Sequence, residues 1–403
     1  MRAPLEDIKV LEVDNYMAAP SAAAILADMG ADVLKIEPIT GDPMRGMSRP
    51  LRVDSSFADY DLQFDVDNRG KRSAAIALDK PEGQALAQRL AQDADVFLCN
   101  LLAQRQQRFG LDPDTLFATN PRLVHATLTG YGTTGPEAWR PGYDVTAFFG
   151  RSGLYDAMRE GEDGVVPMAR PAQGDHTTGL ALVAAILAAL RLAERTGEGQ
   201  VVETSLYETA VWTQASDFGI TATDKAPVRR RARHEQLTPM TNRYPCGDGK
   251  WVVLNMLDGG AWERLCRAIG RTDWLADERL ATGRDRYRHM AELVDGIDAT
   301  LSARTRDEWG AVFDEHGVIW GPVLGLHEVV DDPQANAIGL FPELQHPELG
   351  TYRTVNAPMR FKTAEVRPRG PAPKVGEHTR QILREAGLSQ PELQALFDKG
   401  IIK

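Results

Sequence analysis

One carboxylate in this chain has the setting of a possible nucleophile. Asp175 lies in the segment Pro171-Ala-Gln-Gly-Asp-His-Thr-Thr-Gly179, directly before the apolar run Leu180 to Leu190. A run that is apolar on every face predicts a helix buried on all sides. An aspartate at the start of such a helix is either a cap or a nucleophile. The local pattern alone favours the cap, because an acid there accepts hydrogen bonds from first-turn N–H groups.

A glycine-rich segment offers a second candidate. Gly130-Tyr-Gly-Thr-Thr-Gly135 follows a predicted strand and spells the dinucleotide-binding fingerprint. That fingerprint needs a helix at its end and an acid about 20 residues later. Here Pro136 and Pro141 keep the chain irregular. The segment therefore favours a tight turn, or backbone N–H groups that face some other ligand.

These residues need a scaffold, and the first half of the chain alternates strands with helices. The patterns predict helices at 20–29 and 81–94, and strands at 8–13, 32–37, 73–78, 95–100, 123–128 and 201–206. Such alternation predicts an α/β fold with a doubly wound, Rossmann-like parallel sheet. Ligands on these sheets bind beyond the carboxyl ends of the strands, so the loops at 14–20, 38–46, 99–108 and 129–136 become candidates together.

The second half of the chain has a different character. Pro- and Arg-rich residues predict a linker, and a strand at 250–255 with helices at 262–269, 290–301 and 305–315 predicts a smaller α+β domain. The chain then becomes extended from 331 and ends in helices at 379–385 and 390–398. We therefore expect a large domain from residues 1–220 and 331–403, a linker at 221–239 and a small domain at 240–330.

Composition limits the kinds of partner. The chain has 403 residues and a net charge of −11, which argues against a nucleic-acid surface. We expect no membrane partner, because the apolar run is shorter than the ~20 residues needed to span a bilayer. Glu6 and Asp7 are unlike a signal peptide, which favours a cytoplasmic protein. Cys99, Cys246 and Cys266 lack metal-ligand spacing, so we expect reduced thiols and no metal site.

Many short segments, in order along nearly the whole chain, resemble the family III CoA-transferases. This family includes formyl-CoA and carnitine CoA-transferases and is related to the α-methylacyl-CoA racemases. The matching segments are Ala19-Pro20, Leu26 to Glu37, Gly41-Asp42, Arg45, Asn68 to Ser73, Leu78-Asp79, Asn120 to Val124, Thr129 to Gly132, Gly135-Pro136, Pro141 to Asp144, Gly174-Asp175, Asp332 to Gln334, His346-Pro347 and Gly376 to Thr379. Their number and order argue against chance agreement.

The resemblance implies that Asp175 is the nucleophile of a CoA-transferase. Its carboxylate would attack an acyl-CoA donor to give a mixed anhydride, and the released CoA thiolate would then form an aspartyl-CoA thioester. A free carboxylic acid, as acceptor, would repeat the steps in reverse. The resemblance further implies CoA as co-substrate with no other cofactor, and an interlocked homodimer.

A set of CoA contacts is also implied by the resemblance. Because CoA carries phosphates, basic side chains are required, and Lys71, Arg72 and Arg108 match basic positions of the family. Other matching positions near CoA are Met17, Ala18, Asn100, Leu101, Gly130, Tyr131 and Gly132. Core packing is an equal explanation for Met17 and Leu101, and surface ion pairs are an alternative for the basic residues.

The chain also departs from the family pattern. Cys99 and Leu101 replace the usual Glu and Phe, and Pro38 stands where some members have a CoA-binding arginine.

Two other functions stay open. Racemases use the histidine of a Gly-His-Asp segment as an acid/base partner of the aspartate, whereas this chain has Gly142-Tyr143-Asp144. Tyrosine is a poor substitute near neutral pH. His176 is a further candidate, although side chains that are adjacent at a helix start diverge. The third possibility is a CoA-binding protein without catalytic activity. The donor and acceptor are not indicated by the sequence.

Overall fold

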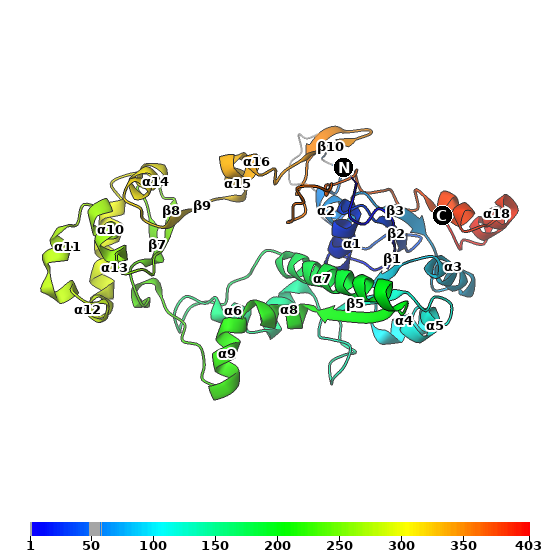
Figure 1. Ribbon diagram of the computed structural model, residues 1–403, viewed down its shortest axis with the longest axis horizontal. Coiled ribbons are helices and arrows are strands. Elements are labelled where there is room, and N and C mark those ends of the chain that lie inside the picture. Colours follow the sequence, from blue (N-terminus) through cyan, green and yellow to red (C-terminus); the bar gives the residue numbers. More distant parts are fainter. Residues whose placement is uncertain (1, 48–56, 58) are drawn as a thin grey trace. The chain divides into compact units, whose positions relative to one another are not determined.

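The computed structural model describes residues 2–47, 57 and 59–403 and contains two compact units (Figure 1). The large unit consists of Met1–Leu154, Met168–Ile220 and Ile338–Lys403, and the small unit of Tyr155–Pro167 and Thr221–Ala337. The segment expected to be a linker, 221–239, thus belongs to the small unit. Residues 155–167 and 331–337, which we assigned to the large domain, lie in the small unit as well.

A six-stranded sheet forms the centre of the large unit. Its strands are β1 (Lys9–Val13), β2 (Asp32–Glu37), β3 (Arg72–Ala75), β4 (Val96–Cys99), β5 (Val124–Thr129) and β6 (Gln200–Ser205). The order is β3-β2-β1-β4-β5-β6, and all neighbours run parallel. This confirms the predicted α/β class. The chain order reverses between β1 and β4, the point at which such sheets bind ligands.

Helices connect the strands and close the large unit. They are α1 (Ala18–Asp28), α2 (Leu62–Asn68), α3 (Pro81–Gln92), α4 (Ala103–Phe109), α5 (Pro113–Phe117), the π-helix Asp144–Arg151, α7 (Gln173–Thr196), α8 (Leu206–Thr213), α17 (Thr379–Glu385) and α18 (Gln390–Asp398). The short helices α2, α4 and α5 and the π-helix were not predicted, and α4 occupies part of the expected loop 99–108.

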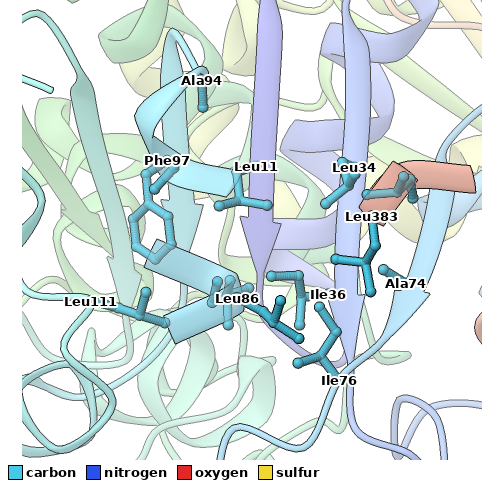
Figure 2. Packing of buried hydrophobic residues seen from close by; sticks show 14 of the residues in the cluster. Leu11, Leu34, Ile36, Ala74, Ile76, Leu86, Ala94, Phe97, Leu111 and Leu383 are labelled. Carbon is cyan, nitrogen blue, oxygen red and sulfur yellow. The ribbon is translucent and has the colours of Figure 1, made fainter. Parts of the chain in front are cut away.

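The core on one face of the sheet joins the two ends of the chain (Figure 2). Leu34 and Ile36 of β2 point to the same face, as the two-residue period of a strand requires. Leu86 from α3 and Leu383 from α17 are buried against the same cluster. The C-terminal segment therefore completes the hydrophobic core that the N-terminal strands begin.

Helix α7 corrects one prediction. Leu182 and Ile186 are fully buried, but Leu180 is 38% exposed and Leu192 is 42% exposed, so the expectation of a helix buried on every side is wrong for the single chain. Against α1 the packing is close, because a Cβ at Gly179 would lie 2.1 Å from the Ser21 hydroxyl. In the described part of the chain, α7 alone is long and apolar enough to cross a membrane, a criterion that core helices of soluble proteins also meet.

The small unit packs helices against an antiparallel sheet of β7 (Thr241–Pro245), β8 (Trp251–Asn255) and β9 (Trp320–Val323). Val252 and Leu254 of β8 are buried, whereas the alternate side chains are exposed. Its main helices are α10 (Ala261–Ala268), α13 (Met290–Leu301) and α14 (Arg306–Glu315).

Shorter elements complete the chain. They are α6 (Leu154–Ala157), α9 (Ala215–Asp224), α11 (Asp273–Ala276), α12 (Gly283–Arg288), α15 (Leu326–Asp331), α16 (Pro333–Ala337), the 3-10 turns Arg233–Glu235 and Glu278–Leu280, and a hairpin of β10 (Glu343–His346) and β11 (Gly350–Arg353). The hairpin and α16 lie in the region that we expected to be extended.

Candidate active site

A cavity of about 200 Å³ lies at the carboxyl edge of the large sheet, where the loops after β1, β4 and β5 meet. Its lining residues are Asn15, Tyr16, Ala18, Asn100, Leu101, Leu102, Arg105, Leu128, Thr129, Gly130, Pro141, Gly142, Tyr143, Asp175 and Leu206. Gly130 and Gly142 let two backbone segments touch, because a Cβ on Gly130 would lie 2.5 Å from the Gly142 Cα. Asp175 is the only acidic side chain among the described residues that line this cavity.

Asp175 belongs to the first turn of α7 but does not cap it. The N-cap is Ala172, which has a left-handed backbone with φ 79°. The carboxylate of Asp144, from the start of the π-helix, instead accepts a hydrogen bond from the Gly174 N–H at 2.9 Å. A remote acid thus satisfies the helix end, and Asp175 is left to face the cavity.

The surroundings of Asp175 favour its protonated form. Burial, and then the neighbouring carboxylate of Asp144, raise the pKa of Asp175 to about 7, with a smaller contribution from Asp67. Burial also raises the pKa of Asp144, although the Gly174 N–H opposes this. Asp175 is therefore a more basic carboxylate than an exposed aspartate, and a better nucleophile for that reason.

His176 has a different partner. Its Nε2 lies 2.9 Å from the Asp67 Oδ1 of α2, and this hydrogen bond raises the pKa of His176 against the effect of burial. His176 is not among the residues that line the cavity with Asp175. Within the described residues, no histidine lines it, so the acid/base partner that a racemase needs has no candidate there.

The loop after β1 is fixed by polar contacts on both sides. The side chain of Asn100 brackets Asn15, accepting from its N–H at 3.2 Å and donating to its carbonyl at 2.7 Å. Next to it, the Tyr16 N–H donates to the Asp42 carboxylate at 3.2 Å. Tyr16 has a left-handed backbone with φ 67°, and its ring meets that of Tyr143 edge-on, with centroids 5.6 Å apart.

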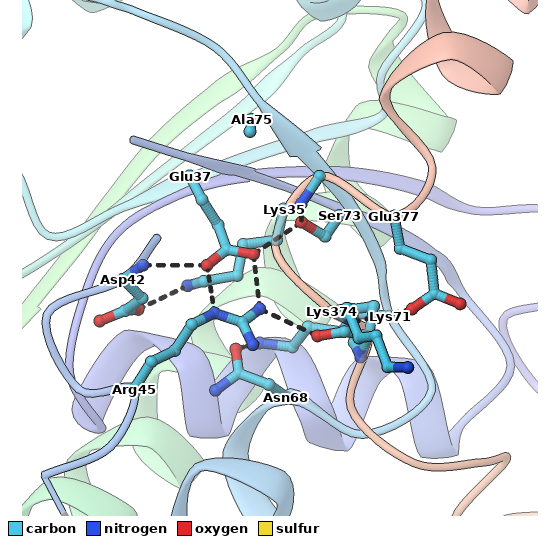
Figure 3. Close-up of polar contacts among 12 residues, drawn as sticks. Lys35, Glu37, Asp42, Arg45, Asn68, Lys71, Ser73, Ala75, Lys374 and Glu377 are labelled. Carbon is cyan, nitrogen blue, oxygen red and sulfur yellow. Dashed lines mark hydrogen bonds and ion pairs between the residues drawn. The ribbon is translucent and has the colours of Figure 1, made fainter. Parts of the chain in front are cut away.

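A buried cluster of charged side chains contacts this loop through Asp42, and Figure 3 shows Lys35, Asp42 and Lys71 of the cluster. The Lys35 ammonium contacts Glu12 at 2.9 Å, Asp14 at 2.7 Å and Asp42 at 3.2 Å, and Lys71 contacts Glu12 at 2.7 Å. Despite burial, the two ammonium groups lower the pKa of Glu12 to about 2. Such a cluster is costly to break, because loss of one ion leaves another buried without a partner.

A second, larger cavity of about 500 Å³ adjoins the first along the same edge of the sheet. The two cavities share three lining residues, Asn15, Leu101 and Arg105. Arg105 makes no ion pair with any described residue, whereas the Lys80 ammonium at the larger cavity donates to the Lys399 carbonyl at 3.2 Å. The shared wall can therefore offer a free guanidinium to an anion.

The structure brings part of the predicted site together. Ala18, Asn100, Leu101 and Gly130 line the cavity with Asp175. Met17, Tyr131 and Gly132 flank it without lining it: Met17 is the residue before α1, Tyr131 lies under the Arg140 guanidinium, and the Gly132 N–H donates to Thr129.

The three predicted basic contacts lie elsewhere. Lys71 is buried on Glu12, and its ammonium also donates to the Pro20 carbonyl at 3.0 Å. Arg72 pairs with Asp32 at the amino end of β2 and with Glu385, on the edge of the sheet away from the cavity. Arg108 is exposed on α4 and lines neither cavity. Their placement gives no support to CoA contacts, which for these residues stay predictions.

Among the polar cavity residues, three were missed. Asn15, Tyr16 and Arg105 line the cavity but do not belong to the residues carried over from the family, and the same holds for the apolar residues Leu102, Leu128 and Leu206. Asn15 and Tyr16 lie in the loop 14–20 and Arg105 in the loop 99–108, both of which the strand pattern marked as candidates. Among the three, only Arg105 could have been singled out from the sequence, because it is a basic side chain that follows a predicted strand.

Comparisons with known proteins show the family of this chain. The model of the CoA-transferase family III matches residues 5–379. (R)-2-hydroxy-4-methylpentanoate CoA-transferase of Clostridioides difficile is 31% identical over 401 residues, which is 99% of each chain. Succinate–glutarate CoA-transferase of Agrobacterium fabrum is 35% identical over 389 residues, covering 95% of this chain and 96% of the relative.

A solved structure shows the same fold. The crystal structure of a CAIB/BAIF family protein from Brucella suis has a TM-score of 0.85 and 29% identity, and the match covers 96% of this chain and 100% of that one. Family model, full-length relatives and fold therefore agree that this chain belongs to the family III CoA-transferases and is an enzyme that uses CoA as co-substrate.

Proposed function

We propose that this enzyme moves CoA from an acyl-CoA to a free carboxylic acid, with Asp175 as the covalent nucleophile. The observation that carries the proposal is the position of Asp175, the one acid among the described residues around a cavity at the carboxyl edge of the sheet. Its raised pKa of about 7 also suits the role. At neutral pH about half of the groups are ionised, and the ionised form is a strong nucleophile for a carboxylate.

The reaction would proceed through two kinds of adduct. Asp175 attacks the donor thioester carbonyl, the C–S bond breaks, and a mixed anhydride and CoA thiolate form. The thiolate then attacks the aspartyl carbonyl and releases the donor acid, leaving an aspartyl-CoA thioester. An acceptor carboxylate attacks this thioester, and the same steps in reverse give the new acyl-CoA and free Asp175.

The two adjoining cavities suit the two ends of an acyl-CoA. The larger has room for the nucleotide, and the smaller holds Asp175, where the thioester must react. The diphosphate of CoA would then cross the shared wall, at which Arg105 is unpaired within the described chain.

We further propose that the enzyme is a cytoplasmic homodimer. Leu180 and Leu192 of α7 are partly exposed, and Trp212 of α8 is 78% exposed. Exposed apolar side chains on these helices favour burial against a partner surface. A second copy of the chain agrees with the family resemblance, and sedimentation at micromolar concentration tests it, with a monomer as the contrary result.

The acids remain to be found by experiment. The relatives carry names that include a branched 2-hydroxy acid and two dicarboxylic acids, so the chemistry common to them is the carboxylate itself. CoA exchange from acetyl-CoA and succinyl-CoA should be screened against branched, aromatic and dicarboxylic acids.

The nucleophile can be tested directly. Incubation with a substrate acyl-CoA should leave a CoA adduct on the peptide that contains Asp175, and hydroxylamine should remove it. Asp175→Ala should form no adduct and show no turnover. Retained turnover in that variant would refute the proposal. Deuterium exchange at the α-carbon of a 2-methylacyl-CoA in the absence of any acid would instead indicate a racemase.

A further inference from the structure

Tyr16 has a backbone conformation that its side chain does not favour. Its φ of 67° lies in the left-handed region, where a side chain with a Cβ is strained. Residues held in this way need surrounding contacts that outweigh the strain, and they gather at functional sites. Tyr16 lines the cavity of Asp175.

Polar contacts on both sides hold the backbone at Tyr16. The Tyr16 N–H donates to the buried Asp42, which in turn lies 3.2 Å from the Lys35 ammonium. The Met44 N–H donates to the same carboxylate at 2.9 Å. On the other side, Asn100 brackets the backbone of Asn15. The strained conformation is therefore fixed by buried charge and by a neighbouring strand end.

Tyr16 is one of two tyrosines that line the cavity of Asp175. The Tyr16 and Tyr143 rings meet edge-on with an interplanar angle of 89°, and both line the cavity of Asp175. The pKa of Tyr16 is raised, first by its hydrogen bond with Tyr143 and then by burial, so its hydroxyl stays protonated. Each hydroxyl has one O–H, so the bond between the two side chains uses one of them and leaves the other free to donate to a ligand in the cavity.

The reaction poses an electrostatic problem that such donors answer. Every acid substrate must bring a carboxylate toward Asp175, whose neighbours include Asp144 and Asp67. Like charges in a partly dehydrated site repel each other, so the incoming carboxylate needs hydrogen-bond donors.

From this juxtaposition we infer that Tyr16, together with Tyr143, binds the carboxylate of the acid substrate beside Asp175. The inference rests on the proposed function and assigns the acid half of that site. The carboxylate held there attacks the aspartyl carbonyl, the C–S bond to CoA breaks, and the thiolate that leaves attacks the acyl carbonyl of the anhydride. The acyl C–O bond then breaks and Asp175 regains its carboxylate.

The test measures the reaction of the acid with the enzyme-CoA thioester separately from the intrinsic reactivity of that thioester. Enzyme is loaded with CoA from acetyl-CoA or succinyl-CoA, desalted, and mixed with 2-hydroxy-4-methylpentanoate or glutarate, whichever the wild type turns over. Tyr16→Phe should lower the second-order rate of this step about 10- to 100-fold, the effect of losing one hydrogen bond to a charged group. Cleavage of the same adduct by hydroxylamine, which carries no carboxylate, should be unchanged. Tyr287→Phe, which alters an exposed tyrosine of the small unit, is the matched control.

A second variant keeps the test independent of folding. Asparagine tolerates the left-handed region, so Tyr16→Asn should unfold at no lower urea concentration than the wild type while it reacts with the acid as slowly as Tyr16→Phe. Equal loss toward acid and hydroxylamine, or wild-type reactivity with acid in Tyr16→Phe, would overturn the inference alone. Failure of the wild type to form any CoA adduct would overturn the proposed function and the inference with it.

Discussion

Replacing Asp175 by asparagine should stabilise the folded protein, and should do so more at high pH than at low pH. The reason is the difference between the pKa of Asp175 in the folded state, about 7, and the value of 3.8 for an unperturbed aspartate. Between these values the unfolded chain has lost the proton and the folded chain has kept it. Stability conferred by the wild-type residue therefore falls as the pH rises through this window.

The magnitude follows from the shift. Each unit of pKa corresponds to about 1.4 kcal/mol, so a shift of about 3 units costs at most about 4 kcal/mol once the pH exceeds 7. At about pH 5.5 only about 2 kcal/mol of that cost has accumulated. Asparagine has no charge to desolvate. The stability gain of Asp175→Asn should thus be about 2 kcal/mol larger at about pH 8.5 than at about pH 5.5.

Urea unfolding at the two pH values measures this difference. Wild type and variant are compared at equal protein concentration, and the gain is the difference between their free energies of unfolding. Asp163→Asn serves as the control, because Asp163 is an exposed acid of the small unit and its removal should give a difference near zero at both pH values. An equal gain for Asp175→Asn at both pH values would refute the raised pKa, and with it the account of why this carboxylate is a good nucleophile.

Three further predictions concern neighbouring groups. Asp144→Asn removes the charge next to Asp175 and should shift the acidic limb of the pH–rate profile to lower pH; an unmoved limb would show that Asp144 does not act on the nucleophile. Arg105→Gln should raise the KM for acyl-CoA about 10-fold or more but leave the KM for the matching acyl-pantetheine, which lacks the diphosphate, unchanged; equal effects on both would place Arg105 away from the phosphates. Lys71→Met should lower the free energy of unfolding by about 3–5 kcal/mol, since Glu12 loses a buried partner, with little change in KM; a raised KM at unchanged stability would restore Lys71 as a CoA contact.

The strands of the large unit were predictable because their burial is uniform. Val96 to Cys99 are four consecutive buried apolar residues, and the run between turn signals indicates a strand of a parallel sheet. The position of Asp175 at a helix start followed from the length of the apolar run after it. The exposed side of α7 could not be predicted, since an apolar helix face has the same sequence whether its own chain or a partner covers it.

The details of the site depend on contacts between distant parts of the chain. Tyr16 carries no local sign of a left-handed backbone, because the groups that hold it are distant in the sequence. Asp42, which binds the Tyr16 N–H, is 26 residues away from Tyr16, and Asn100, which binds the backbone of Asn15, is 85 residues away from Asn15. The contacts of Lys71, which we predicted to bind CoA, also could not be read from the local sequence. A motif gives the residue type but not whether its charge faces a ligand or a buried carboxylate such as Glu12.

Another residue explains why Asp175 does not cap α7. A helix end needs an acceptor for its free N–H groups, and the local sequence offers only Asp175 for that purpose. The fold brings in Asp144, whose carboxylate takes the Gly174 N–H from 30 residues away. Because this charge occupies the positive end of α7, Asp175 gains less from the helix dipole and more repulsion from its neighbour. The same contact therefore frees Asp175 from capping and raises its basicity, which is what covalent attack on a thioester requires.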